Sequence, residues 1–183
     1  MTRILSQQFF NRPAVDVALE LLGKFLVRKQ KGVIENYLIT ETEAYDVFQD
    51  LASHASKGKT KRTEVMFGPA GYWYVYLIYG MYEMLNIVTG PEGYPSAVLI
   101  RGVEGVDGPG KLTRQLGITR VFNKKTATKT SGLWIEDRGI VIPKTSIIQT
   151  SRIGVAYAGE WVKKPWRFVL KIGSASERRS HAA

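Results

Sequence analysis

The sequence predicts a single-domain α+β protein with a curved antiparallel β-sheet, a few short helices and a protruding β-hairpin that carries tyrosines. Its 183 residues are enough for one domain with a substantial core. Most apolar residues fall in short runs of strand-like period, bounded by turns that contain glycine or proline. Two or three segments have the features of helices, and neither an internal repeat nor a long linker divides the chain.

Helices are expected near the N-terminus and after residue 107. The stretch SQQFF reads as a short turn, and Pro13 then marks the start of a helix. In VDVALELLG the apolar residues form one broad face before Gly23. Later in the chain, GPGKLTRQLGI (108–118) reads as a glycine-rich turn that leads into a short helix.

Strands are expected over most of the remaining chain. The predicted strands are 24–29, 33–45, 72–78, 84–90, 95–104, 133–142, 152–159 and 166–172. Tyr79, Gly80 and Met81 form the predicted tip of a hairpin between the third and fourth of these. The final residues, 174–183, are small, polar and basic, so we expect a disordered tail after a domain of residues 1–173.

The strongest signal in the composition is positive charge. Lys and Arg number 26 against 16 Asp and Glu, which gives a net charge of +10 and a pI near 9.8. Such a balance indicates an anionic partner, most often nucleic acid, although general solubility is the alternative explanation. The basic residues cluster in the loop-like stretches SKGKTKR, RVFNKKTATK and KKPWR. Loops of this composition suit phosphate contacts better than base reading.

Composition also excludes several classes of site. The chain has no cysteine and only two histidines, His54 and His181, so disulfides, Cys-ligated zinc or iron–sulfur sites and multi-His metal sites are excluded. We therefore expect no metal and no other cofactor. No run of 18 or more apolar residues predicts a membrane span, and the N-terminus has no secretory pattern. These features predict an intracellular protein that is not bound to a membrane.

One candidate site is the stretch GVDGPGKL (105–112), which has the spacing of a phosphate-binding P-loop between a strand and a helix. However, Leu112 stands where such a loop needs Ser or Thr to bind Mg²⁺, and the repeated βα units of these nucleotide hydrolases are missing. We therefore expect a turn that opens a helix and brings backbone amides near a DNA phosphate.

A second candidate site is ETEAY, within the strand predicted over 33–45. By period two, Glu41, Glu43 and Tyr45 share one face of an otherwise apolar strand. A strand face that points into the core should not carry two glutamates without partners. Either this is an edge strand with solvated glutamates, or a general base lies at the floor of a cleft beside a ring.

The third candidate is the stretch YWYVYLIYGMYEMLN, which is unusually rich in tyrosine. In its first strand Tyr72, Tyr74 and Tyr76 alternate with apolar residues, so one face is ordinary core and the other is a wall of phenols. An aromatic stripe is more often core packing than a ligand site. Together with Glu43, Tyr45 and a basic surface, however, this face could line a pocket that sandwiches a nucleobase.

These motifs, in this order along the chain, resemble those of the alkyladenine (3-methyladenine) DNA glycosylase family. They are ETEAY, His54 nine residues after Tyr45, YVYLIYGMYEMLN, GPGKL and RIGVAYAGEW. The resemblance runs over nearly the whole chain, from the N-terminal helix to KKPWRF. Five separated motifs in register make it very specific. The fold of the family is a single mixed α/β domain with a curved antiparallel sheet, in agreement with the predicted strands.

The resemblance implies a monofunctional DNA glycosylase of base excision repair. Such an enzyme flips an alkylated or deaminated purine out of double-stranded DNA and hydrolyses its N-glycosidic bond, which leaves an abasic site. The implied substrates are 3-methyladenine, 7-methylguanine, hypoxanthine and ethenoadenine. The implied partner is duplex DNA that contains damaged purines, and the protein is expected to act as a monomer on DNA inside the cell.

By resemblance, Glu43 is the general base, which deprotonates the water that attacks C1′ of the flipped nucleotide. Arg101 and the backbone carbonyl of Ile153 help to hold that water. Tyr45 and Tyr76 are the two rings that bracket the extruded base. The ring faces would attract the positive charge of an alkylated purine by roughly 0.5–2 kcal/mol per contact.

The other residues implied by the resemblance shape the pocket and contact the duplex. His54 closes the edge of the pocket, and Tyr74 steadies His54. Asn86 crowds the 2-amino group of a guanine, and Tyr79 is the wedge that fills the gap left by the flipped base. We expect phosphate contacts from Lys57, Lys59, Lys61, Arg62 and Lys111.

Two other functions remain open from the sequence. A non-catalytic nucleic-acid-binding domain on the same fold would keep the basic loops and the tyrosine hairpin but would need neither Glu43 nor Arg101. A bifunctional glycosylase that cleaves the strand would need a buried lysine nucleophile with a lowered pKa, and Lys111 is the only near candidate. The sequence departs from the family pattern at Arg114 and in the Asp46–Ser53 loop, either of which could alter the lesions accepted.

Overall fold

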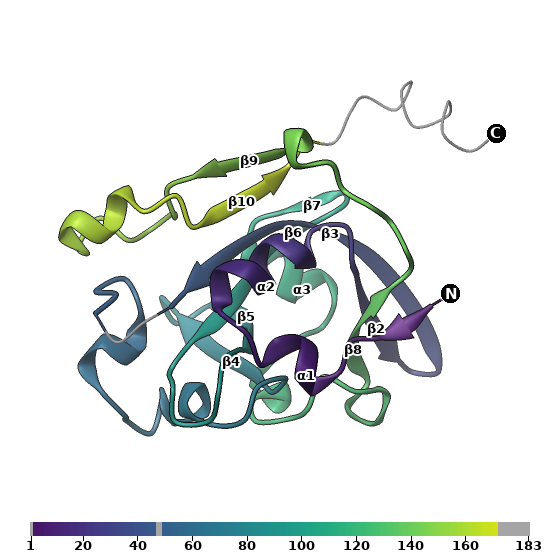
Figure 1. Cartoon of the computed structure of the whole chain (residues 1–183). Helices are drawn as coiled ribbons and strands as arrows, with labels where there is room; N and C mark the ends of the chain where they lie inside the picture. Colours follow the sequence, from purple (N-terminus) through teal and green to yellow (C-terminus); the bar gives the residue numbers. More distant parts are fainter. Residues whose placement is uncertain (1, 47–48, 172–183) are drawn as a thin grey trace.

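The computed structural model describes residues 2–46 and 49–171 (Figure 1). The strands are β1 (Arg3–Ile4), β2 (Phe25–Gln30), β3 (Val33–Tyr45), β4 (Trp73–Ile78), β5 (Tyr82–Val88), β6 (Ala97–Val103), β7 (Val106–Asp107), β8 (Leu133–Asp137), β9 (Ile147–Thr150) and β10 (Arg167–Leu170). The α-helices are α1 (Gln7–Phe10), α2 (Ala14–Leu21) and α3 (Pro109–Gln115). The 3₁₀ helices are η1 (His54–Lys57), η2 (Glu64–Phe67), η3 (Arg120–Phe122), η4 (Lys129–Ser131), η5 (Lys144–Ser146) and η6 (Gly159–Lys163).

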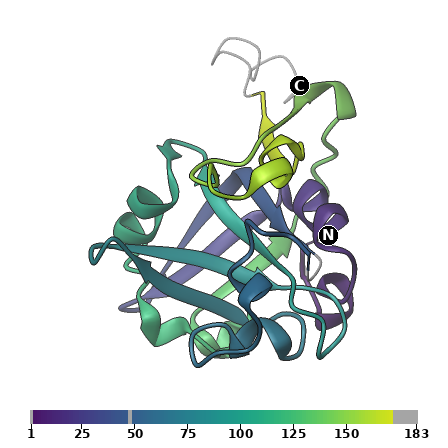
Figure 2. The same cartoon turned by 90° about the vertical axis from the view of Figure 1, so that its left-hand side faces the viewer.

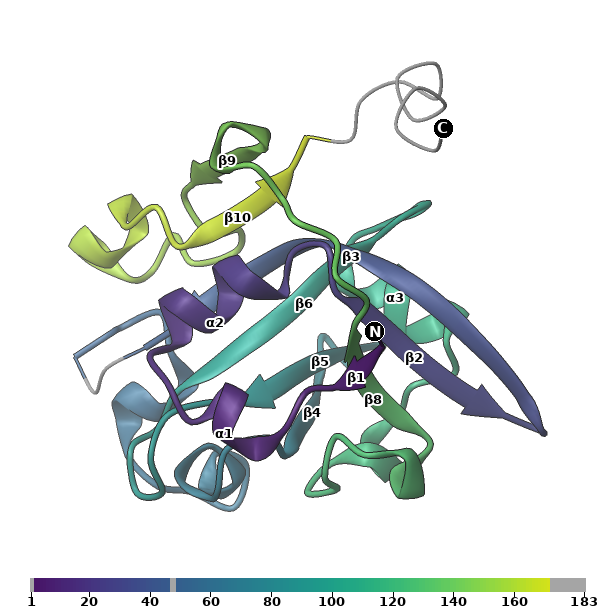
Figure 3. The same ribbon diagram turned by 45° about the vertical axis from the view of Figure 1, so that its right-hand side comes forward.

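The long strand β3 organises the sheet. Its first half pairs with β2, and its second half pairs with β6 on one side and β10 on the other, all antiparallel. Among the described strands the order is β1-β8-β2-β3-β6-β5-β4, with β9 beside β10 and β7 beside β6. Figure 3 shows the sheet curling along β3, with the β2–β3 turn extending away from the rest. The predicted fold class, a single α+β domain on a curved antiparallel sheet, is confirmed.

Helix α2 covers one face of the central strands. It begins directly after Pro13, as predicted, and Gly23 follows its end with a positive φ of 78°. The helix packs on β3 and β6, and its buried residues are Ala14, Val17, Ala18 and Leu21. The Thr42 hydroxyl donates a hydrogen bond of 2.9 Å to the carbonyl of Ala18. Because side chains alternate along a strand, the neighbouring Glu43 then points to the opposite face of β3.

Helix α3 begins within the glycine-rich segment 105–112, directly after Gly108, in agreement with the turn and short helix predicted over 108–118. Pro109 is its first residue, where the missing amide hydrogen costs nothing. Leu112 is fully buried in the main core, against residues of the sheet. The helix packs on β5 and β6, and so it supports one strand of the tyrosine-rich hairpin and the strand that pairs with it.

Two predicted strands differ in the structure. Residues 152–159 are irregular, because the Ile153 amide bonds to a side chain instead of a neighbouring strand and Gly154 has a φ of 78°. The strand predicted over 133–142 ends at Asp137, whose Oδ1 accepts the amide hydrogen of Gly139 in a turn. Strands β1, β7 and β9 are additional to the predicted ones, and the stretch SQQFF, predicted as a short turn, contains helix α1.

The remaining predictions concern the membrane and the C-terminal tail. No helix among the described residues is both long and apolar enough to cross a lipid bilayer. The predicted tail, 174–183, lies outside the part of the chain that the structure describes.

Candidate active site

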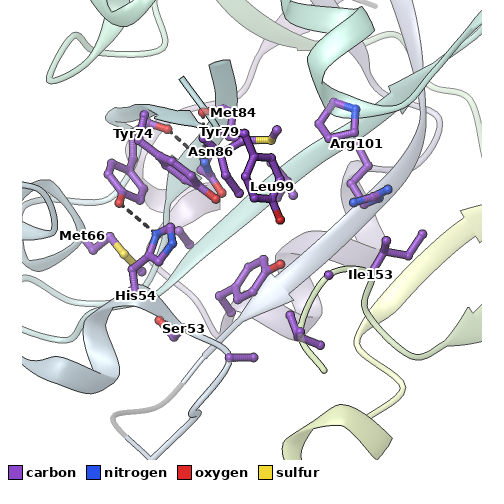
Figure 4. A pocket seen from close by; sticks show the side chains of 18 of the residues that line it. Ser53, His54, Met66, Tyr74, Tyr79, Met84, Asn86, Leu99, Arg101 and Ile153 are labelled. Carbon is purple, nitrogen blue, oxygen red and sulfur yellow. Dashed lines mark hydrogen bonds between the residues drawn. The ribbon is translucent and has the colours of Figure 1, made fainter. Parts of the chain in front are cut away.

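A cavity of about 260 Å³ lies between the β4–β5 hairpin, the end of β3 and two loops (Figure 4). Its walls come from segments that are far apart in the sequence. Predicted site residues that line it are Tyr45, His54, Tyr74, Tyr76, Tyr79, Asn86, Arg101 and Ile153. Glu43 is fully buried and does not line the cavity itself, but residues that donate hydrogen bonds to it do.

Alternation along β4 separates core residues from cavity residues. Trp73 and Val75 are buried in the main core, and the Trp73 indole donates a hydrogen bond of 3.0 Å to the carbonyl of Leu133. Tyr74 and Tyr76 point to the other side, where they line the cavity with ring centroids 5.0 Å apart. The predicted division of this strand into a core face and a phenol face is therefore confirmed.

His54 stands against these two tyrosines. Its Nδ1 lies 3.2 Å from the Tyr74 hydroxyl oxygen (Figure 4). Its ring centroid lies 4.6 Å from that of Tyr76 in an edge-on arrangement. Burial, together with the charges of Arg62 and Lys57, lowers the pKa of His54 to about 4. Burial also raises the pKa of Tyr74 to about 12. At neutral pH both groups are therefore uncharged, and the cavity wall adds no charge here.

Glu43 is held by three groups at the end of β3. The Tyr45 hydroxyl donates to its Oε2 at 2.8 Å, and the Ile153 amide donates to its Oε1 at 2.8 Å. The Arg101 Nε lies 3.5 Å from the same Oε1. Burial raises the pKa of Glu43, and the Arg101 charge and both hydrogen bonds oppose that shift. The group is thus a buried carboxylate with an increased affinity for a proton, in contact with cavity-lining residues.

The second glutamate of the motif, Glu41, is an ion-pair partner. Its Oε1 accepts hydrogen bonds from the Nε atoms of Arg101, at 2.9 Å, and of Arg167, at 2.5 Å. At this point β3 is paired on both sides, by β6 and β10. The interpretation of β3 as an edge strand with solvated glutamates is therefore wrong. Arg101 lies between Glu41 and Glu43 and offsets the repulsion between them.

A buried ion pair that sequence reasoning missed lies behind Tyr45. The guanidinium of Arg152 pairs with both carboxylate oxygens of Asp50, with the Nη2–Oδ1 distance at 2.8 Å, and both side chains are fully buried. It also donates to the carbonyls of Ala44 and Trp161, at 3.0 and 3.3 Å. The pair joins the loop before η1 to the residue that precedes Ile153. The sequence signal was the arginine in RIGVAYAGEW, which gave no indication of its partner.

Tyr157 is a second residue that sequence reasoning did not select. It lines the cavity from the irregular segment 152–159, and its hydroxyl donates a hydrogen bond of 3.3 Å to the carbonyl of Ala52. Its ring is largely exposed beside the opening. The motif that carries it was recognised, but the strand predicted there gave no reason to place its ring at a cavity.

Asn86 and Tyr79 occupy opposite depths of the cavity. Asn86 is buried on β5, and its Nδ2 donates to the carbonyls of Tyr74 and Met84, at 3.1 and 3.2 Å. Tyr79 is 80% exposed at the turn between β4 and β5, with a φ of 53° followed by 71° at Gly80. Figure 2 shows this turn at the left edge of the molecule. A positive φ at two successive residues is typical of the primed turns that fit a twisted hairpin.

The basic residues that were expected to contact phosphates are all exposed, but their surroundings differ. They are Lys57, Lys59, Lys61, Arg62 and Lys111. The first four surround η1 and the turn after it, next to His54, and the Arg62 guanidinium lies 4.8 Å from the centroid of the Tyr76 ring. Lys111 lies on α3 and does not line the cavity. No lysine among the described residues lines the cavity, which leaves the lysine-nucleophile alternative without support.

The described residues also bear on metal binding. They contain no group of three or more His, Cys, Asp or Glu side chains arranged to hold a metal ion. In the P-loop-like segment, Leu112 is buried in the core at the position where a nucleotide hydrolase needs a hydroxyl ligand for Mg²⁺. A leucine in the core cannot take that role.

Comparisons with known proteins identify the family to which the chain is similar. The sequence model of the family described as "Methylpurine-DNA glycosylase (MPG)" matches residues 8–173. Three relatives share the name "Putative 3-methyladenine DNA glycosylase". That of Myxococcus xanthus is 47% identical over 176 residues, 91% of this chain and 90% of its own. That of Anaeromyxobacter sp. is 45% identical, over 91% and 89% of the two chains, and that of Methanocella arvoryzae is 43% identical, over 97% of each.

Proposed function

The chain belongs to the methylpurine-DNA glycosylase family, and from this premise we propose that it is a monofunctional DNA glycosylase that removes damaged purines with a water molecule activated by Glu43. The enzyme binds a flipped purine nucleotide in the cavity and hydrolyses its N-glycosidic bond. The observation that carries this proposal is the buried Glu43 carboxylate beside a cavity walled by aromatic rings. Its substrates are 3-methyladenine and 7-methylguanine in duplex DNA, with hypoxanthine and ethenoadenine as further candidates.

The reaction uses the geometry around Glu43. As the C1′–N bond breaks, both of its electrons leave with the base, and the sugar develops oxocarbenium character. The water oxygen then bonds to C1′, and its proton passes to Glu43. The Ile153 amide and the Tyr45 hydroxyl fix the carboxylate, and Arg101 lies close enough to hold the water. The Ile153 carbonyl is the proposed third partner of that water.

The aromatic walls bind the base. Tyr45 and Tyr76 bracket it, His54 closes the edge of the pocket, and the Tyr74 hydroxyl holds His54. Asn86 supplies the crowding that rejects an unmodified guanine, because its two hydrogen bonds to backbone carbonyls fix the side chain in the cavity wall. A purine is planar, so its recognition by ring faces is tolerant of small substituents.

The test of this function is release of free base from defined lesions. Duplexes with a single 3-methyladenine, 7-methylguanine, hypoxanthine or ethenoadenine are incubated with excess protein, and free base and abasic sites are measured. We expect release of the alkylated purines and a matching number of abasic sites. A folded protein that binds the four duplexes and releases no base from any of them would instead support a non-catalytic nucleic-acid-binding domain.

Tyr79 is the proposed wedge. Its ring is 80% exposed at a hairpin turn, where it contributes little to packing. Stacked in the duplex in place of the flipped base, it would offset an unstacking cost of a few kcal/mol. Tyr79→Ser is therefore expected to slow excision most for a lesion in a well-paired duplex and less for the same lesion opposite a mismatch. The melting temperature should remain near that of the parent.

Single-turnover excision on matched and mismatched duplexes, with a thermal melt of each protein, measures this effect. Val33→Ser is the control, because Val33 is also exposed at the turn of a hairpin but lies on β2–β3. It should leave both rates unchanged. Equal losses on the two duplexes, together with a lower melting temperature for Tyr79→Ser, would show that the ring serves local packing.

The basic segment around η1 is the proposed phosphate-binding surface. Each phosphate contact contributes about 0.9 log unit of affinity per log unit of salt. Replacing Lys57, Lys59 and Lys61 together by glutamine should therefore reduce the salt slope of binding to undamaged duplex by up to about 2.7. The control replaces three exposed lysines elsewhere, Lys29, Lys31 and Lys144, by glutamine, and its salt slope should stay near that of the parent. Equal slopes for both triple variants would exclude the segment as the main phosphate contact.

A further inference from the structure

Each of the two rings proposed to bracket the base carries an arginine. The Arg152 Cζ lies 4.9 Å from the centroid of the Tyr45 ring, and the Arg62 Cζ lies 4.8 Å from that of the Tyr76 ring. Both rings line the cavity, but neither arginine does. Each guanidinium therefore lies over a ring that lines the cavity but does not itself line it, which is the arrangement expected for a cation on the outer side of the ring. A base bound between the two rings would then be the third of five layers, in the order arginine, tyrosine, base, tyrosine, arginine.

The charge of Arg152 is neutralised by a carboxylate, whereas the charge of Arg62 is not neutralised by an ion pair among the described residues. Arg152 is fully buried and forms a two-point ion pair with Asp50. Arg62 is exposed, and no ion pair joins it to a carboxylate among the described residues. Its charge nevertheless acts at the cavity wall, because its guanidinium lies over the Tyr76 ring, contributes to the lowered pKa of His54 and opposes the rise in the pKa of Tyr74. Arg62 is therefore the uncompensated cation of the stack.

We propose that Arg62 is a specificity-determining residue, whose charge behind Tyr76 shifts the enzyme from cationic alkylated purines toward neutral lesions. The proposal rests on the proposed function, in which Tyr45 and Tyr76 bracket the base. In DNA, 7-methylguanine and 3-methyladenine are cationic, whereas hypoxanthine and ethenoadenine are neutral. A cation on the outer face of a ring opposes a second cation on its inner face, since both draw on the same ring electrons.

Charge repulsion acts in the same direction. A base stacked on Tyr76 would lie roughly 8 Å from the Arg62 guanidinium, at van der Waals spacing on the inner face. At that distance in a partly exposed site, two positive charges repel by enough to change a binding ratio several-fold. The predicted attraction of the rings for cationic bases is therefore weakened at Tyr76. At Tyr45 the Asp50 carboxylate compensates the charge behind the ring.

The transition state adds a benefit for neutral lesions. When a neutral purine leaves with the bonding electrons it becomes an anion, and a nearby fixed cation stabilises that charge. A methylated purine becomes neutral as it leaves, so Arg62 gives its departing form no such stabilisation. His54 is neutral at physiological pH, so it is a poor proton donor to a neutral leaving group. Arg62 thus supplies electrostatically part of what protonation would supply.

The sequence predicts that Arg62 contacts a DNA phosphate. Loss of a phosphate contact alone would have a different effect on the preference between lesions. Loss of such a contact weakens binding to every duplex by the same factor, whichever lesion it carries. A charge behind the base-binding ring changes the ratio between cationic and neutral lesions. The ratio therefore separates the two roles, even if Arg62 has both.

The test compares Arg62→Gln with the parent on matched duplexes that carry 7-methylguanine or hypoxanthine. Single-turnover rates at several enzyme concentrations give the second-order constant for each lesion. We expect the 7-methylguanine to hypoxanthine ratio of these constants to rise by about three- to tenfold in Arg62→Gln. Arg62→Lys, which keeps the charge, should stay closer to the parent. Dissociation constants for both duplexes are also measured with Glu43→Gln. Adding Arg62→Gln to this variant should increase its binding preference for the cationic lesion over the neutral one.

Lys59→Gln is the matched control, because it removes one positive charge from the same segment without contact to either ring. It should lower affinity for both duplexes and keep the ratio within about twofold. A ratio that is unchanged in Arg62→Gln, or that moves equally in Lys59→Gln, would overturn the specificity role and leave the glycosylase function intact. A parent protein that releases neither base would overturn the proposed function and this proposal with it.

Discussion

Replacing Glu43 with glutamine is expected to slow base excision by about 10²–10⁴-fold while leaving lesion binding nearly unchanged. The amide has the shape of the carboxylate but cannot accept the proton of the attacking water. Its oxygen can still accept the hydrogen bond from the Ile153 amide, and its NH2 group can donate to the Tyr45 hydroxyl oxygen, so the side chain keeps its place. Single-turnover excision and equilibrium binding to a lesion duplex measure the two effects separately.

The pH dependence of the parent gives an independent test of the same group. Burial raises the pKa of Glu43 above the ordinary value of 4.5, and a general base acts only when it is deprotonated. Excision should therefore decline as pH falls through a pKa above 4.5, and this decline should be missing from the residual activity of Glu43→Gln. A variant that excises within a few-fold of the parent, with the same acid limb, would show that Glu43 is not the base.

Replacing Asp50 with alanine is expected to lower stability by about 3–5 kcal/mol, because it leaves the Arg152 guanidinium buried without its counter-ion. Both side chains are fully buried, and their contact closes a loop between segments on either side of the cavity. For a domain of this size the melting temperature should fall by roughly 6–20 °C. Excision should also fall at temperatures where the variant stays folded, because Arg152 stacks on the Tyr45 ring.

Glu160→Ala is the control for this prediction. Glu160 also forms an ion pair, at 3.0 Å with Lys163, but both of these side chains are exposed. Exposed pairs contribute little, so this variant should melt close to the parent. If Asp50→Ala melts no lower than Glu160→Ala, the buried pair does not hold the two segments together.

Local pattern was sufficient to predict the strands that carry the site. The period of two in 33–45 and 72–78 predicted which side chains share a face, and β3 and β4 follow it. Trp73 and Val75 pack into the core and Tyr74 and Tyr76 line the cavity, because the pleat fixes this alternation whatever the partner strand is. The alternation of side chains along a strand depends only on the local sequence, so the local sequence was sufficient to predict it.

Long-range pairing was beyond the reach of the pattern. Asp50 and Arg152 are 102 residues apart, and nothing in either segment specifies the other. The apolar alternation of 152–159 resembled a strand, but the Ile153 amide bonds to Glu43 and the Arg152 side chain turns inward. Arg62 likewise read as one more cation in a basic loop, although it lies over Tyr76. Tertiary contacts, which no periodicity encodes, decide each of these cases.

The chemistry of the cleavage step can be read from a single reaction with a lesion duplex. Parent protein in excess is mixed with an end-labelled 7-methylguanine duplex, with and without sodium borohydride, and free base, strand length and protein–DNA adducts are measured before any heat or alkali treatment. With a Glu43-activated water as nucleophile, base is released, the strand stays intact and borohydride traps no adduct. A trapped adduct or a cleaved strand would mean that an amine attacks C1′, and would contradict the proposed mechanism.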